Sequence, residues 1–502
     1  MNFTESSDIV LRPHAQAIHS RLHVLFTICS YVLIFWICLP AFLLVTGFRL
    51  DQLLPVQMAV GPGMKVAGSL LLFAGAALMA ASMGQLWFQG RGLPISHLPP
   101  SEFVAVGIYK YLRHPIYVGY TIAFAGLSVL LNSFWSLTFS TALLVALWIA
   151  YALFYEEPAL TARFENTFAG YQQTTALLLP RKLSAPFARL LRHSARWFSR
   201  PLDRMANWTI MYQRGELILV TYGAFVTVGA FLFMYLSSSI LMAQGVTTAH
   251  TVFALLLGGF CILFFARFFW WAAHWREMIG QPMFGIRQIG FVSFGGFFGW
   301  CLFAVIFSLI YDYSLLMIFD SVVRGMFIAW TLGRLGCLTY GCCYGLESKT
   351  SGILLYTDPE SKVVRERGPQ HTPRHATQLY AFAKNLFFLI FVNTIVFWDL
   401  PAGFVTAITF ILYAVARSYV EFLRDRRRYK HVFTGGHICC AVMFVTGWLL
   451  LLFLSPTIGA ASPKPLTLDA LYQGLVLVPL IAFLSLVGFV ATSLHWKKIG
   501  TL

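Results

Sequence analysis

Charged residues are scarce in this chain, and acidic residues are the scarcer kind. Only 11% of the 502 residues are charged, with 20 acidic against 36 basic side chains. A soluble domain carries about 25% charged residues, so water cannot be the main solvent of this protein. The remaining composition agrees, because 58% of the residues are hydrophobic. We therefore expect an integral membrane protein.

The sequence contains neither a secreted disulfide framework nor a nucleic-acid-binding domain. Its nine cysteines do not follow the spacing of such a framework. Its net charge of +16 comes from basic residues in loops between apolar runs, so nucleic acid is not an expected partner. Basic loops of this kind instead indicate which side of the membrane is cytoplasmic.

Long apolar runs define the predicted fold. A helix needs about 20 apolar residues to cross a bilayer, and about 12 runs of that order follow one another. They lie near 22–47, 60–88, 116–132, 134–155, 216–238, 250–274, 288–311, 314–333, 376–398, 402–422, 437–455 and 471–493. The prediction is an all-α polytopic protein with about 12 transmembrane helices in two modules. A cytoplasmic N-terminus puts every basic cluster inside, so we expect a multi-pass protein of the inner (plasma) membrane.

A basic segment separates the two modules. In 183–204, apolar residues such as Phe187 and Trp197 recur at helical spacing, and arginines fill the other face. An amphipathic helix on anionic lipid is the natural interpretation, with a plain cytoplasmic linker as the alternative. The expected parts are a membrane module at 1–182, this helix or linker, and a second membrane module at 205–502.

The first module gathers both signs of charge at one inner surface. The side chains are Arg113, His114, Tyr117, Glu156, Glu157 and Arg181. Adjacent carboxylates at the end of a membrane helix are costly unless they reach water or have a function. A cofactor with an amine and a carboxylate needs both signs, because a glutamate binds the ammonium and an arginine pairs with the carboxylate. Aromatic rings can cover a sulfonium or an adenine.

Residues 60–182 resemble the isoprenylcysteine carboxyl methyltransferase and phospholipid methyltransferase family. The resemblance rests on RHPIYVG, on the paired glutamates, and on the segment from Gly170-Tyr171 to Pro180-Arg181. It implies S-adenosylmethionine as the cofactor, with contacts to His114, Tyr117, Glu156, Glu157 and Arg181. Arg113 is a further expected contact, because its charge suits the cofactor's carboxylate. The alternative is that these residues are ordinary anchors at the ends of helices.

The second module carries polar residues within apolar helices. Arg417, Glu421 and Arg424 fall at i, i+4 and i+7 on one helical face, so the glutamate can bridge both arginines. In 320–345, Arg334 lies among four glycines. Ionisable residues inside membrane segments are functional by default, and arginine suits phosphate. These positions predict a site for an anionic lipid head group.

Residues 215–455 resemble prolipoprotein diacylglyceryl transferase. The matching pieces are Tyr222-Gly223, FFARFF, Ser293 with Gly295-Gly296, GRLGCLTYGCCYG, RHATQLYAF and ARSYVEFLRD. The resemblance implies that Arg334 and Arg417 hold the phosphate of a phosphatidylglycerol-like donor, that Glu421 and Gln378 support them, and that Arg334, Arg417 and Glu421 act in catalysis. It implies lipid contacts for Tyr222, Arg267, Ser293, Gly295, Gly296, Gln378 and Arg424. That family moves the diacylglyceryl group to a thiol and releases glycerol phosphate.

Two departures from the family pattern concern catalysis directly. Phe294 stands where the family has a histidine before its Gly-Gly pair. The histidines that could substitute for it are His371, His375 and His437. In addition, Cys337 stands where the family has asparagine.

Cysteines are concentrated in that same segment. Cys337, Cys342 and Cys343 form C-x4-C-C, which is not a standard zinc spacing, and no fourth ligand is evident. Packing of small side chains is the expected explanation. No metal is expected from the sequence.

The two resemblances together predict a bifunctional membrane enzyme. One half transfers a diacylglyceryl-type group, and the other methylates a lipid or a lipidated product. The alternatives are a diacylglyceryl transferase with a degenerate first module and a non-catalytic lipid-binding or transport protein. The acceptor is expected to be a lipid or a lipoprotein. The family's active face is turned outside the cell, whereas the basic loops here predict an active face on the cytoplasmic side.

Overall fold

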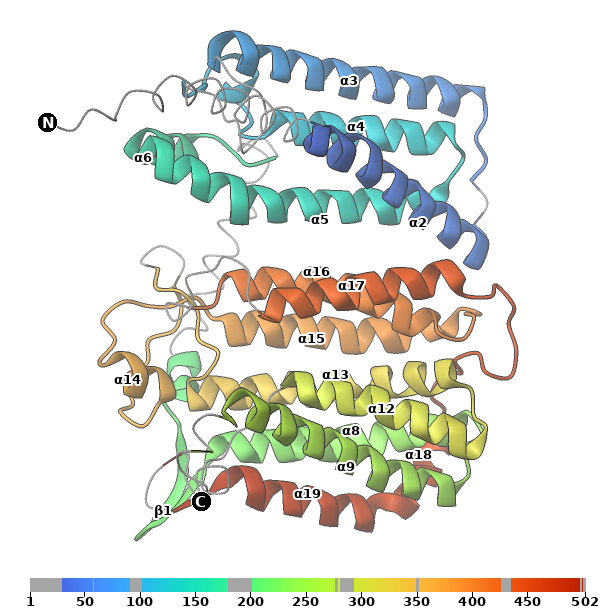
Figure 1. Ribbon diagram of the computed structural model, residues 1–502, viewed down its shortest axis with the longest axis vertical. Coiled ribbons are helices and arrows are strands. Elements are labelled where there is room, and N and C mark those ends of the chain that lie inside the picture. Colours follow the sequence, from blue (N-terminus) through green and yellow to red (C-terminus); the bar gives the residue numbers. More distant parts are fainter. Residues whose placement is uncertain are drawn as a thin grey trace, which may run out of the picture. The chain divides into compact units, whose positions relative to one another are not determined.

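A computed structural model gives the fold. It describes residues 29–56, 58–90, 102–178, 201–275, 279, 293–348, 352–425, 435–496 and 499. The chain divides into two units, Met1–Leu190 and Leu191–Leu502, and each is described by itself (Figure 1).

The first unit is built from apolar helices. Its elements are η1 (Val32–Cys38), α2 (Leu39–Leu53), α3 (Pro62–Gly90), η2 (Gly107–Lys110), α4 (Pro115–Leu130), η3 (Ser136–Ser140), α5 (Thr141–Tyr151), η4 (Ala152–Glu156) and α6 (Glu157–Thr174). The elements from η3 to α6 follow one another without a break, so they form one candidate membrane span. The second half of the predicted hairpin is thus longer than the sequence suggested.

Small residues let α3 and α4 pack closely. A Cβ added at Gly75 would lie 2.4 Å from the backbone nitrogen of Ala123, and one at Gly126 would lie 2.5 Å from that of Leu72. Only glycine permits backbones to approach this closely, which is how membrane helices gain packing energy without a hydrophobic driving force between them.

A tight turn joins α4 to η3. Asn132 has a φ of 55° there, a left-handed conformation that asparagine tolerates better than most residues. Asp51 at the end of α2 then accepts hydrogen bonds from the Ser133 hydroxyl and, at 3.1 Å, from the backbone nitrogen of Trp135. The predicted helical break at Asn132 is confirmed.

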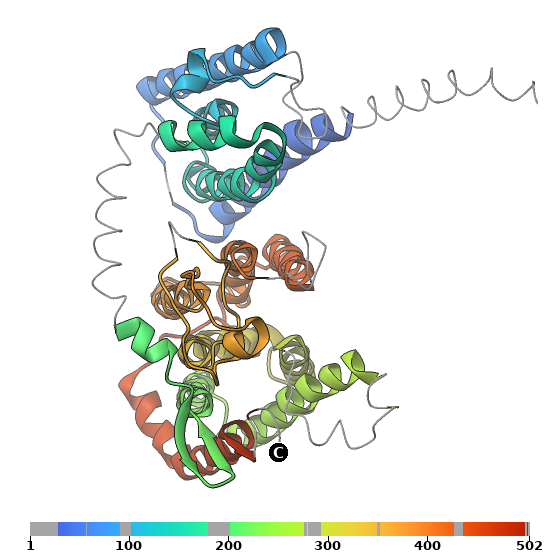
Figure 2. The ribbon, with the colours of Figure 1, turned by 90° about the vertical axis from the view of Figure 1, so that its left-hand side faces the viewer.

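The second unit holds the remaining helices. They are α8 (Thr221–Ala243), α9 (Thr248–Ala273), α12 (Ser293–Tyr311), α13 (Leu315–Tyr340), α14 (Lys362–Arg367), α15 (Thr377–Thr394), α16 (Phe404–Phe422), α17 (Gly435–Phe453), α18 (Leu468–Gly474) and α19 (Val478–Ser493). In Figure 2, α8, α13, α15, α16 and α17 are seen nearly end-on and lie side by side, whereas α9 and α19 are inclined to them. The long connection between α13 and α15, which contains α14, lies at one end of this bundle.

A small sheet adds to the predicted all-α fold. β1 (Ile210–Arg214), β2 (Leu217–Val220) and β3 (Leu494–Trp496) pair antiparallel in that order. Leu217 faces Trp496 across the β2–β3 pair. The sheet therefore joins the segment before α8 to the segment after α19.

The predicted linker ends within the second unit. Residues 201–206 are helical, and the Asp203 carboxylate accepts a hydrogen bond from the backbone nitrogen of Leu355 at 3.1 Å. Asn207 accepts from the backbone nitrogen of Asp358 at 3.0 Å. The amphipathic part of the prediction, up to residue 200, lies outside the described residues.

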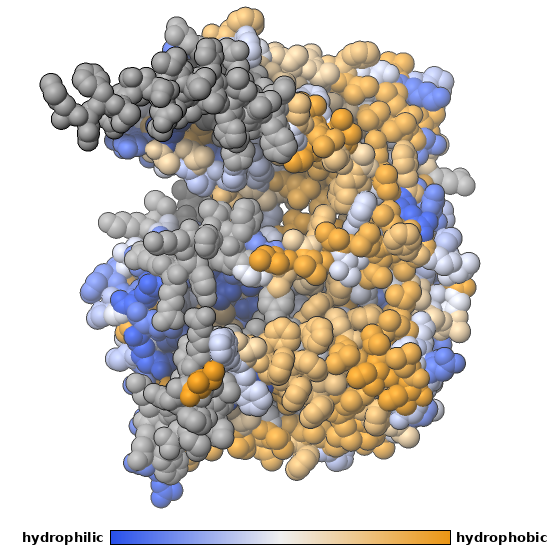
Figure 3. All heavy atoms as spheres, in the orientation of Figure 1, coloured by the Kyte–Doolittle hydropathy of each residue, from blue (hydrophilic) through white to orange (hydrophobic). Residues whose placement is uncertain are grey.

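Lipid-facing surfaces are plain in both units. Ten helices among the described residues are long and apolar enough to cross a membrane, and α4 and Gly295–Tyr311 are shorter apolar helices. Large apolar side chains point outward, among them Leu309 at 80% and Phe453 at 83% exposure. In Figure 3 the faces of α9, α12 and α19 are largely hydrophobic, whereas hydrophilic residues gather near α14. The protein is therefore a polytopic membrane protein, as predicted.

A buried aspartate of α13 caps the start of α16. The Asp320 carboxylate accepts hydrogen bonds from the Gly403 nitrogen at 2.7 Å, and from the Thr406 nitrogen and hydroxyl at 2.8 and 2.7 Å. It thereby satisfies backbone donors that every helix leaves unpaired at its N-terminus. This cap fixes the position of α16, which carries Arg417 and Glu421.

We expect Asp320→Ala to lower the free energy of unfolding by about 3 kcal/mol, because it leaves buried donors unpaired. Thermal unfolding of the purified protein in detergent measures the loss. Asp469→Ala, at an exposed helix start in α18, is the matched control. Equal effects of the two substitutions would contradict a stabilising role for the buried cap.

Candidate functional site

The polar cluster of the first unit forms where α4 begins and η4 passes into α6. His114 occupies the N-cap position of α4 and Pro115 its first turn, where proline is favoured because no backbone donor is lost. The backbone nitrogen of Arg113 donates to Ala176 at 2.9 Å, and that of His114 donates to Leu177 at 3.3 Å. The two ends of the hairpin are thus joined beside the paired glutamates.

His114 lies between the two glutamates. Its Nδ1 is 3.3 Å from Glu156 Oε2, and its Nε2 is 3.3 Å from Glu157 Oε1. Arg113 approaches the same Glu157 oxygen at 3.2 Å, and Gln172 donates to the other at 3.0 Å. Glu157 is thereby held by three neighbours and is nearly buried, with 7% of its side chain exposed.

Glu156 is the more accessible carboxylate. Its Oε2 accepts a hydrogen bond from the Tyr117 hydroxyl and pairs with His114, and 28% of its side chain is exposed. Among the described residues, its Oε1 has no hydrogen-bond partner. This oxygen can receive an ammonium or a hydroxyl group from a ligand.

Stacked rings extend from the histidine. His114 stacks on Tyr117 with ring centroids 5.2 Å apart, and Tyr117 stacks on Trp148 at 4.5 Å. Such stacked rings can interact with a cationic ligand. Trp148 and Gln172 were missed from the sequence, because a single Trp or Gln in an apolar or amphipathic run carries no pattern. Of the predicted contacts, Arg181 lies outside the described residues, and the other five meet in this cluster.

The protonation of His114 follows from its neighbours. Burial alone would lower its pKa, but the charge of Glu156 and the hydrogen bonds to both glutamates outweigh burial and raise the pKa to about 9. A histidine whose pKa is raised on folding stabilises the folded protein. This stabilisation is fully present when the pH lies below the pKa of the unfolded chain, about 6.5. That stabilisation is lost as the pH rises through the folded value.

We therefore expect the first unit to lose stability as the pH rises from about 6.5 through about 9. The loss is on the order of 3 kcal/mol. His114→Asn should flatten this dependence, as followed by thermal unfolding in detergent across that range. The control is His250→Asn in α9, where His250 bonds the Tyr313 hydroxyl at 3.0 Å. A wild-type profile no steeper than that of His114→Asn would contradict the assignment.

The predicted arginine–glutamate ladder is present at the end of α16. Glu421 forms an ion pair with Arg417 and accepts a hydrogen bond from Arg424 Nη1 at 3.0 Å. A Cβ added at Gly436 of α17 would lie 2.9 Å from the carboxylate of Glu421. The contacts predicted from i, i+4 and i+7 spacing are confirmed, although Arg424 lies just beyond the last helical residue.

A further group of cations lies between α13, α15 and α16. Lys384 of α15 places its ammonium 3.4 Å from the ring centroid of Tyr413. This ammonium is buried and has no hydrogen-bond partner among the described residues. It lies within electrostatic range of Arg334 and Arg417. Arg334 itself makes no hydrogen bond or ion pair within the described part of the chain. Lys384 was missed, because one lysine in YAFAKNLFF forms no pattern with a partner.

The turn after α13 brings the cysteines beside this cationic group. Gln378 donates to the carbonyl of Cys342 at 2.8 Å and to the Tyr356 hydroxyl at 2.9 Å. Thr377 donates to the carbonyl of Cys343 at 2.7 Å. Gln378, predicted as a lipid contact, therefore holds the backbone of the cysteine turn, and its buried Oε1 has no partner among the described residues.

Arg374 holds the connection between α13 and α15. It is 1% exposed and bonds Glu347 at 2.6 Å, Asp425 at 2.9 Å and the carbonyl of Gly345 at 3.0 Å. Its guanidinium also lies 5.1 Å from the ring centroid of Tyr344. A buried arginine with this many partners is structural, and it ties the loop to the residues that follow α16.

The other predicted lipid contacts are spread along the bundle. Tyr222 lies in the first turn of α8 and packs on Tyr340, with ring centroids 5.6 Å apart. Arg267 of α9 lies over Trp270, 4.7 Å from the ring centroid. A Cβ at Gly295 would lie 2.0 Å from the carbonyl of Phe265, so this glycine serves the packing of α12 on α9.

Two predicted positions add little to this picture. Gly296 lies near Ile262 of α9, where a Cβ would make ordinary contact at 3.6 Å. Ser293 begins α12, but its side chain lies outside the described part, as does that of Phe294.

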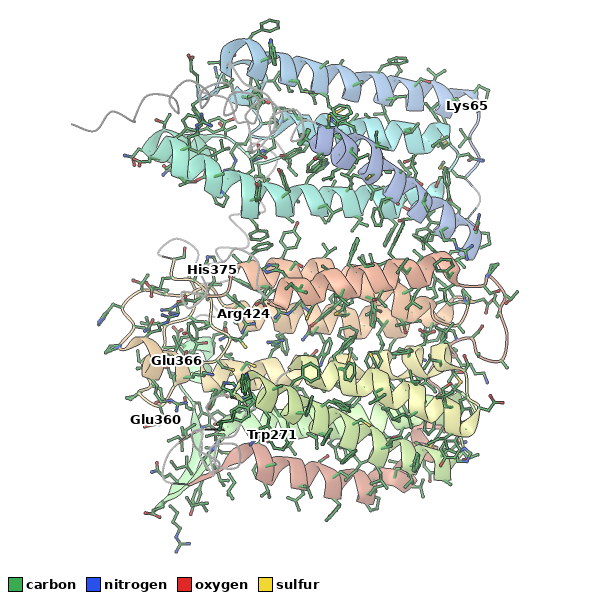
Figure 4. The ribbon with its side chains drawn as sticks, viewed as in Figure 1. Lys65, Trp271, Glu360, Glu366, His375 and Arg424 are labelled. Atoms are coloured by element: carbon green, nitrogen blue, oxygen red, sulfur yellow. The ribbon has the colours of Figure 1, made fainter. Side chains whose placement is uncertain are left out.

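Two of the three candidate histidines lie near the arginines. The ring of His437, at the start of α17, lies 4.2 Å from that of Phe422, next to Glu421. His375 precedes α15, and its carbonyl is close to Gly345. Burial lowers the pKa of His375, so this ring is neutral at physiological pH and can accept a proton. Figure 4 shows His375 and Arg424 at the same end of the unit as Glu366.

Comparison with known proteins agrees with this division. A family model described as prolipoprotein diacylglyceryl transferase matches residues 209–453, and one described as phospholipid methyltransferase matches residues 64–167. The first of these ranges contains the cationic site, and the second contains His114, Tyr117 and the paired glutamates.

Curated relatives match part of the chain. A phosphatidylglycerol–prolipoprotein diacylglyceryl transferase 2 of Clostridium perfringens is 31% identical over 188 residues, 36% of this chain and 66% of that relative. A phosphatidylglycerol–prolipoprotein diacylglyceryl transferase of Clostridium tetani is 29% identical over 143 residues, 28% of this chain and 53% of that relative. The chain thus spans less than two thirds of the length of these relatives. It combines an N-terminal domain of the phospholipid methyltransferase family with a C-terminal domain of the prolipoprotein diacylglyceryl transferase family.

Proposed function

We propose that the chain is a bifunctional lipid-modifying enzyme of the membrane. Its second unit transfers a diacylglyceryl-type group from a phosphatidylglycerol-like donor. Its first unit methylates a lipid or a lipidated product with S-adenosylmethionine. The observation that carries the transferase half is the excess of positive charge between α13, α15 and α16.

An anionic ligand would balance that excess. Arg334, Lys384 and Arg417 interact electrostatically, and Glu421 compensates Arg417 while also pairing with Arg424. Like charges within apolar helices repel strongly, because the surrounding dielectric constant is low. A lipid phosphate placed among them removes the repulsion and supplies acceptors for the unpaired Arg334 guanidinium.

In the proposed transfer, negative charge develops on the leaving phosphate, and the nearby cations stabilise it. The thiolate sulfur of an acceptor attacks the glyceryl carbon that bears the phosphate oxygen, so a carbon–sulfur bond forms and a carbon–oxygen bond breaks. Glycerol phosphate leaves with the electron pair, and Arg334, Arg417 and Lys384 stabilise its negative charge. The proton of the acceptor thiol goes to a base, for which His375 and His437 are the candidates.

The methylation half rests on the cluster around Glu156. Its free oxygen suits the ammonium of S-adenosylmethionine, and the rings of Tyr117 and Trp148 suit its sulfonium and adenine. The bound cofactor supplies an electrophilic methyl group, and the protein binds and orients it. Arg113 is engaged by Glu157, so Arg181 becomes the better candidate for the cofactor's carboxylate.

Basic loops favour a cytoplasmic position for both sites. The connection after α13 and the segment around Arg424 lie at the same end of the second unit, as Figure 4 shows for Glu366 and Arg424. Both segments are rich in Lys and Arg, which favours the cytoplasmic side. A reporter fused after residue 425 tests this, and reporter activity outside the cell would restore the family's orientation.

The transferase proposal is tested with the purified chain in vesicles of isotope-labelled phosphatidylglycerol and a cysteine peptide. Release of glycerol phosphate, with label in the peptide, is the expected result. Labelled methionine fed to expressing cells tests the other half, with label expected in a lipid or a lipidated peptide. Transfer without methylation would identify a transferase with a degenerate first module. Bound lipid with neither reaction would identify a lipid-binding or transport protein.

A further inference from the structure

Three thiols meet in the turn that follows α13. The Sγ atoms of Cys337, Cys342 and Cys343 all lie within 4.8 Å of one another. All three residues are partly buried and none is in a disulfide. Among the described residues, these three cysteines form a group whose side chains could together hold a metal ion.

The end of the helix explains how the thiols come together. Gly341 has a φ of 69°, its nitrogen donates to Leu338, and the Cys342 nitrogen donates back to Cys337 at 3.2 Å. This is the Schellman arrangement, in which the second residue beyond the cap contacts the residue that begins the last turn. Cys337 and Cys342 occupy those two positions. Cys343 then adopts a φ of 56°, a conformation rare for residues other than glycine, and its thiol joins the other two.

Contacts from α15 hold this arrangement in place. Gln378 and Thr377 bond the carbonyls of Cys342 and Cys343 at 2.8 and 2.7 Å. The two bonds come from the first two residues of α15, a helix that also packs against α13. The thiols are therefore presented by a backbone that is fixed on both sides.

We propose that Cys337, Cys342 and Cys343 bind a thiophilic metal ion of the zinc class. Zinc–sulfur bonds of about 2.3 Å in a tetrahedral site place sulfur atoms about 3.8 Å apart. The present separations of up to 4.8 Å close to that value with side-chain movements of about 1 Å or less. This proposal departs from the expectation that the three cysteines only pack as small side chains. That expectation rested on their spacing in the sequence, which does not show that their sulfur atoms lie close together.

The charges around the turn agree with a thiolate–metal site. Three thiolates and a divalent ion carry a net charge of −1, and binding releases up to three protons from the thiols. Arg334 lies within electrostatic range of all three cysteines, and Arg424 within range of Cys343. Three protein ligands leave a fourth coordination position, which water or an external thiol can take, as in sites where zinc binds a reactant.

The test uses the purified full-length protein in detergent, with zinc measured by mass spectrometry after desalting. About one zinc per chain is expected, as for a single mononuclear site. Cys337→Ser with Cys343→Ser should lower zinc affinity by at least about tenfold, since losing even a residue that only supports a ligand has that effect. Cys301→Ser, in α12, is the matched control and should retain the metal. Equal zinc content in all three proteins would overturn the proposal.

A second measurement leaves the wild-type sequence unchanged. Removing the metal with a chelator should make three further thiols reactive toward a thiol reagent, and re-addition of zinc should protect them. Cadmium added to the stripped protein should produce a thiolate charge-transfer band that the double variant lacks. A thiol count unaffected by the chelator, or a disulfide within the cluster, would contradict the metal site. None of these measurements requires transferase activity, so their outcome is independent of the proposed function.

Discussion

Arg334→Lys is expected to lower the kcat for diacylglyceryl transfer by about 10²–10³-fold, the usual cost of removing one donor that stabilises a developing negative charge. Lysine keeps the charge but loses the planar pair of donors that matches a phosphate. Arg334 makes no hydrogen bond or ion pair within the described residues. Its replacement by lysine therefore removes no hydrogen bond or ion pair of the fold among the described residues.

The measurement is release of glycerol phosphate from labelled phosphatidylglycerol, with thermal unfolding recorded on the same samples. Arg334→Gln should be at least as severe as the lysine variant. Lys362→Gln on α14, whose side chain is 43% exposed, removes the same charge from the surface and should leave the rate unchanged. Full activity of Arg334→Lys would favour a lipid-binding protein over a transferase.

Glu156→Gln is expected to raise the KM for S-adenosylmethionine by about 30-fold, corresponding to roughly 2 kcal/mol for a lost ion pair with the cofactor's ammonium. The same change at Glu157 should act differently. Glu157 is held by Arg113, His114 and Gln172, so Glu157→Gln should lower the thermal stability of the first unit as well. Because Glu156 also pairs with His114 and accepts from Tyr117, KM and thermal stability are measured for both variants, and the larger rise in KM is expected for Glu156→Gln.

Cofactor binding can be followed directly by calorimetry or by photo-crosslinking of the methyl donor. Glu165→Gln, at an exposed position of α6, is the control for loss of one carboxylate from the same unit. If Glu156→Gln binds the cofactor as the wild type does, the cluster only anchors the helix ends. The transferase half of the proposal is unaffected by that result.

The features that could be predicted from the sequence are those that depend on residues close together in the chain, such as apolar runs and residues at helical spacing. Apolar runs gave the membrane helices, and Arg417, Glu421 and Arg424 were placed together because helical spacing puts them on one face. Asn132 marked a helical break, because it interrupts two apolar runs.

The features that could not be predicted depend on contacts between distant segments. Lys384 is meaningful only because α15 packs beside α13 and α16, which its own sequence does not specify. The β2–β3 pairing of Leu217 with Trp496 joins segments from opposite ends of the second unit. The three thiols meet because Gly341 and Cys343 take left-handed conformations, and a cysteine gives no sign of that conformation.

The way Arg374 is buried decides how a lipid can reach the cationic site. This single side chain ties Glu347 and Gly345, after α13, to Asp425, after α16. Lifting the loop away from the end of α16 would break the ion pair of Arg374 with Asp425, and it would leave buried charges unpaired at a cost of several kcal/mol. The loop is therefore a fixed wall and not a lid. If the second unit acts on a lipid as proposed, we expect the lipid to enter the cationic site sideways from the bilayer, between helices.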